Sequence, residues 1–131
     1  MTAQIVANFI EDVWNKRSLH LAEAYLHPDF IDHSLPRELT PDTEGLKKWV
    51  ALTSASFEHH TVIEDQVTEG DKSIVKVILQ VKHTGTWRGI PATLKEVSVA
   101  GYRLFWLKED KIVEHWALID GNSLEKQLRN S

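Results

Sequence analysis

The feature that most constrains the fold is a change in the spacing of apolar residues near residue 61. Before this point apolar side chains recur every three or four residues, and after it they recur at every second residue. The first spacing is typical of helices that bury one face, and the second is typical of strands that bury one face. The sequence therefore predicts a helical N-terminal half and a C-terminal half made of strands.

Three helical segments are expected in the N-terminal half. The first covers residues 5–14, in which apolar residues fall on one side and polar residues on the other. Ser18 can cap a second helix, and Pro28 ends it because its ring clashes with the preceding turn. Residues 29–36 should then be extended or looped. Asp42 precedes the third helix, whose apolar stripe is formed by Leu46, Trp49, Val50, Thr53 and Phe57.

The C-terminal half is expected to form consecutive hairpins. Strands are predicted over residues 61–69, 72–87, 96–108 and 111–120, with turns at the glycine, proline and acidic residues between them. Gly85 and Gly101 lie inside strands and can bend them. A short amphipathic turn at the C-terminus can bury Leu124 and Leu128.

Helices followed by hairpin-linked strands are typical of the α+β class. At 131 residues the chain has the size of one ordinary domain, so we expect a single domain over residues 1–131. We expect a curved antiparallel sheet wrapped around the N-terminal helices, so that its concave face lines a cone-shaped pocket.

Composition excludes several classes of function. The net charge of −4 gives no basic field to hold a phosphate backbone, so we expect no nucleic-acid partner. The chain has no cysteine and no H-E-x-x-H or G-x-S-x-G motif, so we expect no metal site, no cofactor and no hydrolase-type nucleophile. No secretory signal and no run of ~20 apolar residues is recognised, so we expect a cytoplasmic protein without membrane contact.

Alternation along the predicted strands places three polar residues on one face. His83, Arg103 and His115 share this face with apolar residues, and His33 can join them because apolar neighbours draw its segment into the core. Buried histidine and arginine are unfavourable unless paired, so their convergence predicts a functional pocket. The alternatives are structural histidines and an arginine that reaches the mouth of the cone. Residues 59–60, both histidines, are expected to face solvent at a helix end.

The opposite face of the predicted sheet is also apolar. It carries Ile78, Tyr102, Leu104, Trp106, Trp116 and Leu118. This is too much apolar surface to leave in water on a small domain. We expect a homodimer through this outer face, with Trp106 and Trp116 in the interface. The alternatives are that the C-terminal tail covers part of the face, or that it binds another protein.

Four segments resemble the SnoaL-like polyketide cyclase family, within the nuclear-transport-factor-2-like (ketosteroid-isomerase-like) superfamily. They are "YLHPDFIDHS", "HTGTWRGIPAT", "YRLFWLKEDKIVEHWALID" and "LEKQL", and they follow one another over nearly the whole chain. The resemblance implies a cystatin-like α+β barrel shaped as a cone, and family members are commonly dimers.

The resemblance also implies where the chemistry departs from the family. In its aldol-type cyclases an aspartate two residues after the histidine of the last strand acts as general acid/base, and that position here is Ala117. Those cyclases carry a histidine where this chain has Arg103, and their inward histidine of the H-x-G segment is retained as His83. Asp120 lies on the opposite face, and it can turn inward only if a bulge intervenes.

Two functions remain open. The first is cofactor-independent acid/base chemistry, by cyclisation, isomerisation or hydration, on a small apolar carbonyl compound. His115 and His83 would be the acid/base groups, Arg103 the anion stabiliser and His33 an accessory donor. The second is a non-catalytic dimeric protein that binds a small hydrophobic ligand, which Ala117 favours.

Three apolar residues are expected to line the pocket in either case. Trp49, Trp87 and Ile90 can form its walls or a lid, with residues 88–93 as a loop near the mouth. Plain core packing is the alternative for the two tryptophans.

Overall fold

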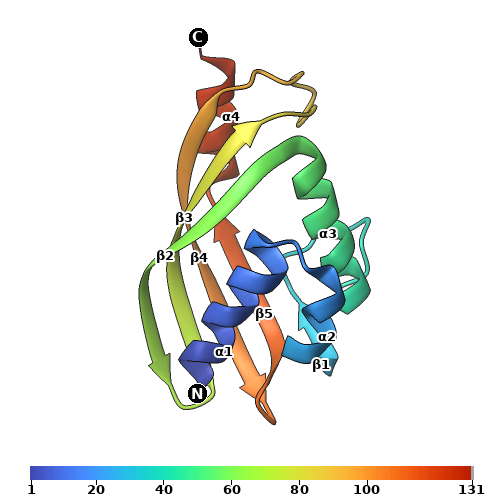
Figure 1. Cartoon of the computed structure of the whole chain (residues 1–131), viewed down its shortest axis with the longest axis vertical. Coiled ribbons are helices and arrows are strands. Elements are labelled where there is room, and N and C mark those ends of the chain that lie inside the picture. The colour runs from blue at the N-terminus through green and yellow to red at the C-terminus, as the bar shows by residue number, and fades with distance from the viewer. Residues whose placement is uncertain (131) are drawn as a thin grey trace.

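The computed structural model describes residues 1–130 and confirms the predicted α+β fold, with helices gathered against one side of a sheet (Figure 1). The helical segments are α1 (Thr2–Phe9), the π-helical turn η1 (Ile10–Asn15), the 3₁₀ turn η2 (Leu19–Leu21), α2 (Ala22–Tyr25), α3 (Thr43–Ser56) and α4 (Gly121–Arg129). The strands are β1 (Leu26–Asp32), β2 (Phe57–Glu69), β3 (Lys72–His83), β4 (Glu96–Lys108) and β5 (Lys111–Ile119).

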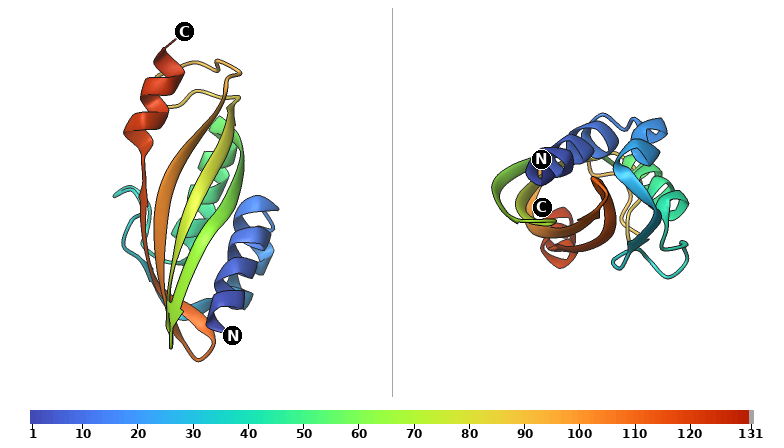
Figure 2. Two further views of the ribbon diagram at one scale, coloured as in Figure 1. Left: turned by 90° about the vertical axis from the view of Figure 1, so that its left-hand side faces the viewer. Right: turned by 90° about the horizontal axis from the view of Figure 1, so that it is seen from below.

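The five strands form one mixed sheet in the order β1-β5-β4-β3-β2. Strands β2 to β5 pair antiparallel as predicted, whereas β1 pairs parallel with β5 and departs from the prediction. Residues 26–32, which were expected to form the end of a helix and the start of an extended or looped segment, form this strand instead. Leu26, Phe30 and Asp32 turn into the interior, and their burial stabilises the strand. The sheet stops at β1 and β2 and curls without closing, which leaves an open cone (Figure 2).

The helices α1, η1 and α3 cover the concave face of this sheet, which we call the inner face (Figure 2). The main core forms between them, and it is apolar, as a buried helix-on-sheet contact requires. Its fully buried members include Val6, Phe9, Val13, Leu46, Val50, Val75, Val77, Phe105 and Ile112. The predicted alternation along β3 is confirmed, since Val75, Val77, Val81 and His83 are buried there.

The third helix begins as predicted and ends earlier than predicted. The Asp42 side chain accepts a hydrogen bond from the Gly45 backbone N–H at 3.0 Å, which caps the first turn of α3. The helix stops at Ser56, and Phe57 opens β2. His59 therefore lies on a strand, 7% exposed and on the inner face, so the prediction that it faces solvent was wrong.

Gly101 allows the close approach of β4 and β5 where the sheet curls. A Cβ atom at this position would lie 2.4 Å from Ile119 Cδ1 and 3.0 Å from the Leu118 carbonyl oxygen. A side chain at this position would displace the Ile119 side chain and press on the Leu118 carbonyl, which glycine avoids. A bulge between Trp106 and Leu107 bends the same strand pair further.

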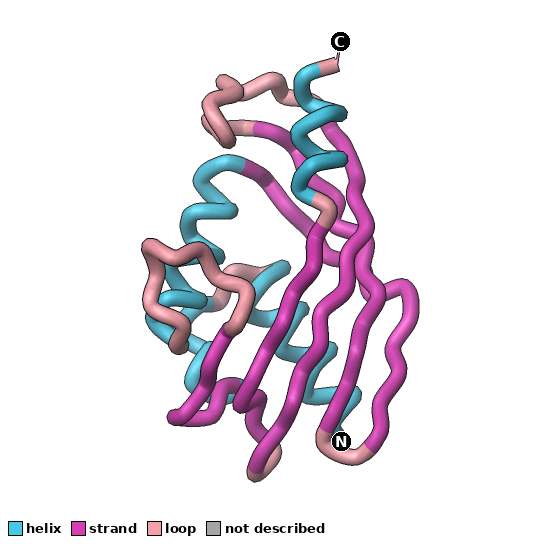
Figure 3. Tube along the Cα trace, turned by 180° about the vertical axis from the view of Figure 1, so that it is seen from behind, coloured by secondary structure: helices cyan, strands magenta, loops and turns pink. Residues whose placement is uncertain are grey.

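The C-terminal helix α4 lies over the upper end of the sheet (Figure 3). Leu124 and Leu128 are buried as predicted, and they pack in one cluster with Val81 and Val99 of the inner face. The tail therefore covers the inner face, and not the outer apolar face as the alternative held. No helix within residues 1–130 is long and apolar enough to span a membrane.

Two cations join α4 to the loop of residues 84–95. Arg88 donates to Glu125 Oε1 at 3.1 Å near the start of α4. The Lys95 ammonium group donates to the carbonyl oxygens of Gln127, Leu128 and Asn130 at its end. A cation at a helix C-terminus meets the unpaired carbonyls and the negative end of the helix dipole. The loop and α4 thus form one cover over the upper inner face.

Candidate functional site

A carboxylate–histidine pair lies buried where β1 meets β5. Asp32 and His115 are directly opposite in the parallel pairing and are 2% and 3% exposed. His115 Nδ1–H donates to Asp32 Oδ2 at 2.9 Å, and Asp32 Oδ1 accepts from the backbone N–H and the hydroxyl of Ser34 at 2.9 and 2.6 Å. Because an ionised carboxylate only accepts, the ring proton lies on Nδ1 and Nε2 keeps its lone pair.

The surroundings of this pair set its charge state. Burial raises the pKa of Asp32, but the hydrogen bonds from His115 and Ser34 outweigh it and hold the pKa below its ordinary value. Burial lowers the pKa of His115, the hydrogen bond to Asp32 opposes this, and the charge of Arg103 lowers the pKa further. At neutral pH the pair is an ionised carboxylate beside a neutral imidazole, which is the state a general base requires.

Arg103 on β4 is a buried cation beside the pair. Its Nη1 donates to His115 Nε2 at 3.4 Å, and its guanidinium carbon lies 4.8 Å from the centroid of the Trp14 ring. Burial lowers the pKa of Arg103 to about 10 while Asp32 opposes the shift, so the group stays charged at neutral pH. Among residues 1–130 it forms no ion pair. Ala117 lies directly opposite on β5 and supplies no counter-charge.

The π-helical turn η1 brings Trp14 to the other side of Arg103. Such turns are rare and are frequent at functional sites. Asn15, in the same turn, binds the edge of β2 through both halves of its amide: Nδ2 donates to the Thr61 carbonyl at 3.0 Å, and Oδ1 accepts from the Thr61 N–H at 2.7 Å. These bonds hold η1 against β2, two residues from His59. The Trp14 and His59 rings lie 6.0 Å apart, edge to face.

His59 is held as one tautomer by Ser54. The Ser54 hydroxyl donates to the Val50 carbonyl at 2.8 Å, so its oxygen must accept from His59 Nε2–H at 2.9 Å. Nδ1 then carries a lone pair that is buried and has no hydrogen-bond partner in the described part of the chain. Burial, with the charges of Arg17 and Arg103, lowers the pKa of His59 to about 4. The ring is therefore neutral at pH 7.

The lowered pKa predicts a loss of stability in acid. The unfolded chain binds a proton at His59 near pH 6.5 and the folded chain near pH 4, so the free energy of unfolding falls as the pH drops through this window. The shift corresponds to about 3 kcal/mol. Denaturant unfolding at pH 7 and pH 4 should therefore show a loss about 3 kcal/mol smaller in His59→Leu than in the wild type. His60→Leu, on the exposed neighbour, should leave the loss unchanged; equal losses in all three proteins would contradict the assignment.

His83 does not join Arg103 and His115, although it shares their face. Arg103 is opposite Val75, and His83 lies eight residues further along β3, which is about 26 Å of strand. Its Nδ1 accepts from the Thr93 N–H at 3.2 Å and lies 3.0 Å from the Thr93 hydroxyl. The proton is then on Nε2, which is buried without a partner among residues 1–130. In the structure His83 anchors the loop that covers the upper inner face.

His33 lies on the outer face and not in the interior. Its ring stacks on Trp116 at 4.5 Å, and its Nε2 pairs with Glu114 Oε1 at 2.9 Å. Successive side chains of an extended chain point to opposite faces, so His33 turns outward because Asp32 turns inward. The predicted convergence of His33 with the other polar residues is therefore not found.

The three predicted apolar residues lie around the core, in two places. Trp49 is partly buried and packs against the main core. Trp87 and Ile90 join the second cluster beside α4, where they bracket a tight turn with positive φ at Arg88 and Gly89. Trp87 and Ile90 lie in the loop that forms the cover with α4.

Three interior polar residues of this site were not singled out from the sequence, namely Asp32, Trp14 and His59. No signal existed in the sequence for Asp32, because its alternation with exposed residues and its parallel pairing with β5 are seen only in the structure. None existed for Trp14, since a π-helical turn follows no periodic pattern. The structure therefore gives a row of polar groups from Asp32 through His115 and Arg103 to Trp14 and His59.

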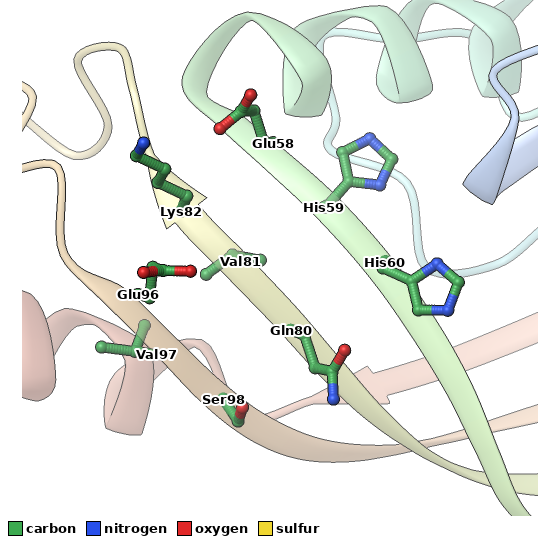
Figure 4. A pocket seen from close by; sticks show the side chains of 9 residues that line it. All are labelled: Glu58, His59, His60, Gln80, Val81, Lys82, Glu96, Val97 and Ser98. Carbon is green, nitrogen blue, oxygen red and sulfur yellow. The ribbon is translucent and has the colours of Figure 1, made fainter.

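Two surface hollows are present, and His59 of this row is among the residues that line the first. One of about 430 Å³ crosses β2, β3 and β4, where Glu58, Lys82 and Glu96 form one row and His60, Gln80 and Ser98 another (Figure 4). The other, of about 480 Å³, lies between Tyr102, Leu118 and the start of α4. The side chains named here point outward, whereas His59, Val81 and Val97, which also line the first hollow, belong to the inner face. Neither hollow is lined by His115 or Arg103, so neither is the predicted interior pocket.

Comparisons with known proteins agree with this architecture. IdmH from Streptomyces antibioticus, a candidate polyketide cyclase, superposes with a TM-score of 0.88 at 23% identity over 98% of both chains. A candidate polyketide cyclase from Acidithiobacillus ferrooxidans gives 0.87 at 22% identity over 98% of this chain and 94% of that one. AclR from Streptomyces galilaeus, a candidate hydroxylase, gives 0.81 at 21% identity over 98% and 97%. A search of curated proteins gives no significant match.

These likenesses show the fold, and the sequence itself shows the family. The profile of the SnoaL-like polyketide cyclases matches residues 4–128, which is nearly the whole chain. The chain belongs to the SnoaL-like polyketide cyclase family.

Proposed function

We propose that this protein catalyses cofactor-independent acid/base chemistry, by cyclisation, isomerisation or hydration, on a small apolar carbonyl compound. The observation that carries the proposal is the buried row of Asp32, His115 and Arg103, which combines an ionised carboxylate, a neutral imidazole whose Nε2 lone pair faces Arg103, and a cation without an ion pair. None of these three groups is required to pack the core. Burying a charge without a counter-charge moreover destabilises the folded protein.

The proposed base is His115 Nε2. It removes a proton from the carbon next to the substrate carbonyl, and the electron pair of the broken C–H bond moves onto the carbonyl oxygen as an enolate. The imidazolium that forms is stabilised by the ionised Asp32, which is already bonded to Nδ1–H. Arg103 supplies fixed positive charge 3.4 Å from Nε2, where the enolate oxygen develops.

The catalytic cycle can be completed without a cofactor. In a cyclisation the enolate carbon attacks a second carbonyl of the same substrate, a C–C bond forms, and His115 returns its proton to the new alkoxide oxygen. The protein ends in its starting protonation state. This route assigns the proton transfer to His115 because Ala117, at the family's acid position, has no proton to move. His83 lies too far along β3 to take part, and the His33 side chain lies on the opposite face of the sheet.

A non-catalytic binding protein is the second candidate, and Ala117 favours it. The two candidates are separated by screening small bicyclic ketones and linear diketones for a rise in the melting temperature, followed by turnover assays on those that bind. Stabilisation grows with saturation, so weak specific binders are detected. Turnover that disappears in His115→Ala supports the enzyme. Binding with no turnover in the wild type supports the binding protein.

We also propose that two chains associate through the outer face. Trp106 and Trp116 pack edge to face at 4.9 Å on this face, and Tyr102 and Leu118 are 47% and 77% exposed. Exposed apolar surface of this kind on a small domain is typical of an interface.

The dimer is tested by light scattering. At micromolar concentration the wild type should have twice the 15.0 kDa mass of one chain, and Leu118→Glu should have the mass of one. Val67→Glu is the matched control, since Val67 is 64% exposed on the distant part of β2 and should leave the mass unchanged. A wild type of single mass would contradict the proposal.

A further inference from the structure

One end of the polar row carries a hydrogen-bond donor and an acceptor that are both unused. Trp14 Nε1 is a donor only, and His59 Nδ1 is an acceptor because Ser54 fixes the ring proton on Nε2. Both atoms are buried, and neither has a hydrogen-bond partner in the part of the chain that the structure describes. The two rings are neighbours at 6.0 Å, and Arg103 lies against Trp14.

These groups are not there for packing. An unsatisfied buried polar atom destabilises a folded chain, and phenylalanine or leucine would fill the same volume without that penalty. The chain moreover fixes the unused atoms in place, since Ser54 holds the His59 ring and the Asn15–Thr61 bonds hold the turn that carries Trp14. A rigid donor beside a rigid acceptor has the form of a binding subsite.

The chemistry of the pair selects its ligand. A carbonyl oxygen or a carboxylate accepts from Trp14 but offers no hydrogen to His59 Nδ1, and the neutral ring cannot become a donor near pH 7. An ammonium group donates to His59 but offers nothing to Trp14, and it would be repelled by Arg103. A hydroxyl group does both, since its oxygen accepts and its hydrogen donates.

We propose that Trp14 and His59 form a subsite for a hydroxyl group of the substrate, next to the place where Arg103 and His115 act on its carbonyl. This inference rests on the proposed function for the carbonyl half, and it narrows the substrate to a hydroxylated carbonyl compound of phenol, enol or alcohol type. Neither unused atom is open to solvent, so the ligand enters as the surrounding side chains shift.

The subsite is tested with probes that have no carbonyl group. Binding of 1-naphthol and 2-naphthol is measured by calorimetry against 1-methoxynaphthalene and 2-methoxynaphthalene, whose oxygen accepts but cannot donate. In the wild type at pH 7, one naphthol at least should bind about tenfold more tightly than its methyl ether. His59→Leu keeps a similar volume without the acceptor, and it should reduce this preference to below about twofold.

Two further variants separate recognition from loss of structure. His60→Leu changes the adjacent exposed residue and should keep the tenfold preference. Trp14→Phe removes the donor and should weaken the naphthol and its ether together, because the ether oxygen also accepts from Nε1. A preference that survives His59→Leu, or naphthols that bind no better than their ethers, would overturn the subsite.

The outcomes also separate this inference from the proposed function. If naphthols show the preference that depends on His59 while no ketone is turned over, the subsite stands and the enzyme proposal fails. If ketones are turned over with dependence on His115 while the naphthols show no preference, the enzyme proposal stands and the subsite fails.

Discussion

Replacement of His115 by alanine is expected to lower kcat by about 10²–10⁴-fold, because a positioned general base contributes a factor of this size. The variant leaves the buried Asp32 with only its Ser34 hydrogen bonds, so a loss of stability is expected beside the loss of turnover. Turnover of a ketone found in the thermal-shift screen is the measurement, with circular dichroism as the check on folding. His33→Ala is the control: it removes a histidine from the outer face of the neighbouring strand, and turnover should stay within about threefold.

Asp32→Asn should act on the same step with a distinct signature. Both carboxylate oxygens accept hydrogen bonds, so an asparagine must point its NH₂ group at a donor and lose either the His115 or the Ser34 contact. The bond to Asp32 raises the pKa of His115, so its loss should move the acid limb of the kcat/KM profile to lower pH. A variant that loses turnover while its pH profile stays in place would show that Asp32 only supports the fold.

Strand periodicity predicted the inner and outer faces correctly, because side chains alternate strictly along a strand. His115 and Arg103 were found in this way, and their contact at 3.4 Å follows from their places on adjacent strands. The alternation of side chains predicts which face a residue lies on, but not how far along the sheet it lies from a residue of another strand. His83 shares the face but lies eight residues beyond the partner of Arg103, and only the register of β3 against β4 reveals this.

The residues that were missed lie where local pattern carries no information. Asp32 becomes part of the site through parallel pairing with a strand more than 80 residues later, and such pairings leave no trace in the local sequence. His59 was assigned to a helix end because the apolar stripe of α3 continues to Phe57 at helical spacing, although the chain is already extended there. The tautomers of His59 and His115 depend on Ser54 and Asp32, and so only the folded contacts define which nitrogen is free.

Arg103→Met is expected to remove most activity while leaving the protein as stable as before or more stable. Arg103 is 7% exposed and has no ion pair in residues 1–130, and methionine offers similar length without a charge to desolvate. Turnover should fall by about 10²–10³-fold, the usual effect of losing a group that stabilises an oxyanion. The free energy of unfolding should stay level or rise, because no ion pair of Arg103 is broken. Arg37→Met, in an exposed loop, should change neither quantity.

The pH profile of Arg103→Met distinguishes chemistry from packing. The charge of Arg103 lowers the pKa of His115, so its removal should let that pKa rise towards the ordinary value and move the acid limb of kcat/KM to higher pH. Asp32→Asn should move the same limb in the opposite direction, because Asp32 raises the pKa. Opposite shifts from the two variants require that one titrating group lies between a carboxylate and a cation, and His115 is in contact with both. If Arg103→Met instead unfolds the protein readily and leaves the profile of the remaining activity unchanged, Arg103 supports the fold and the enolate must be stabilised elsewhere.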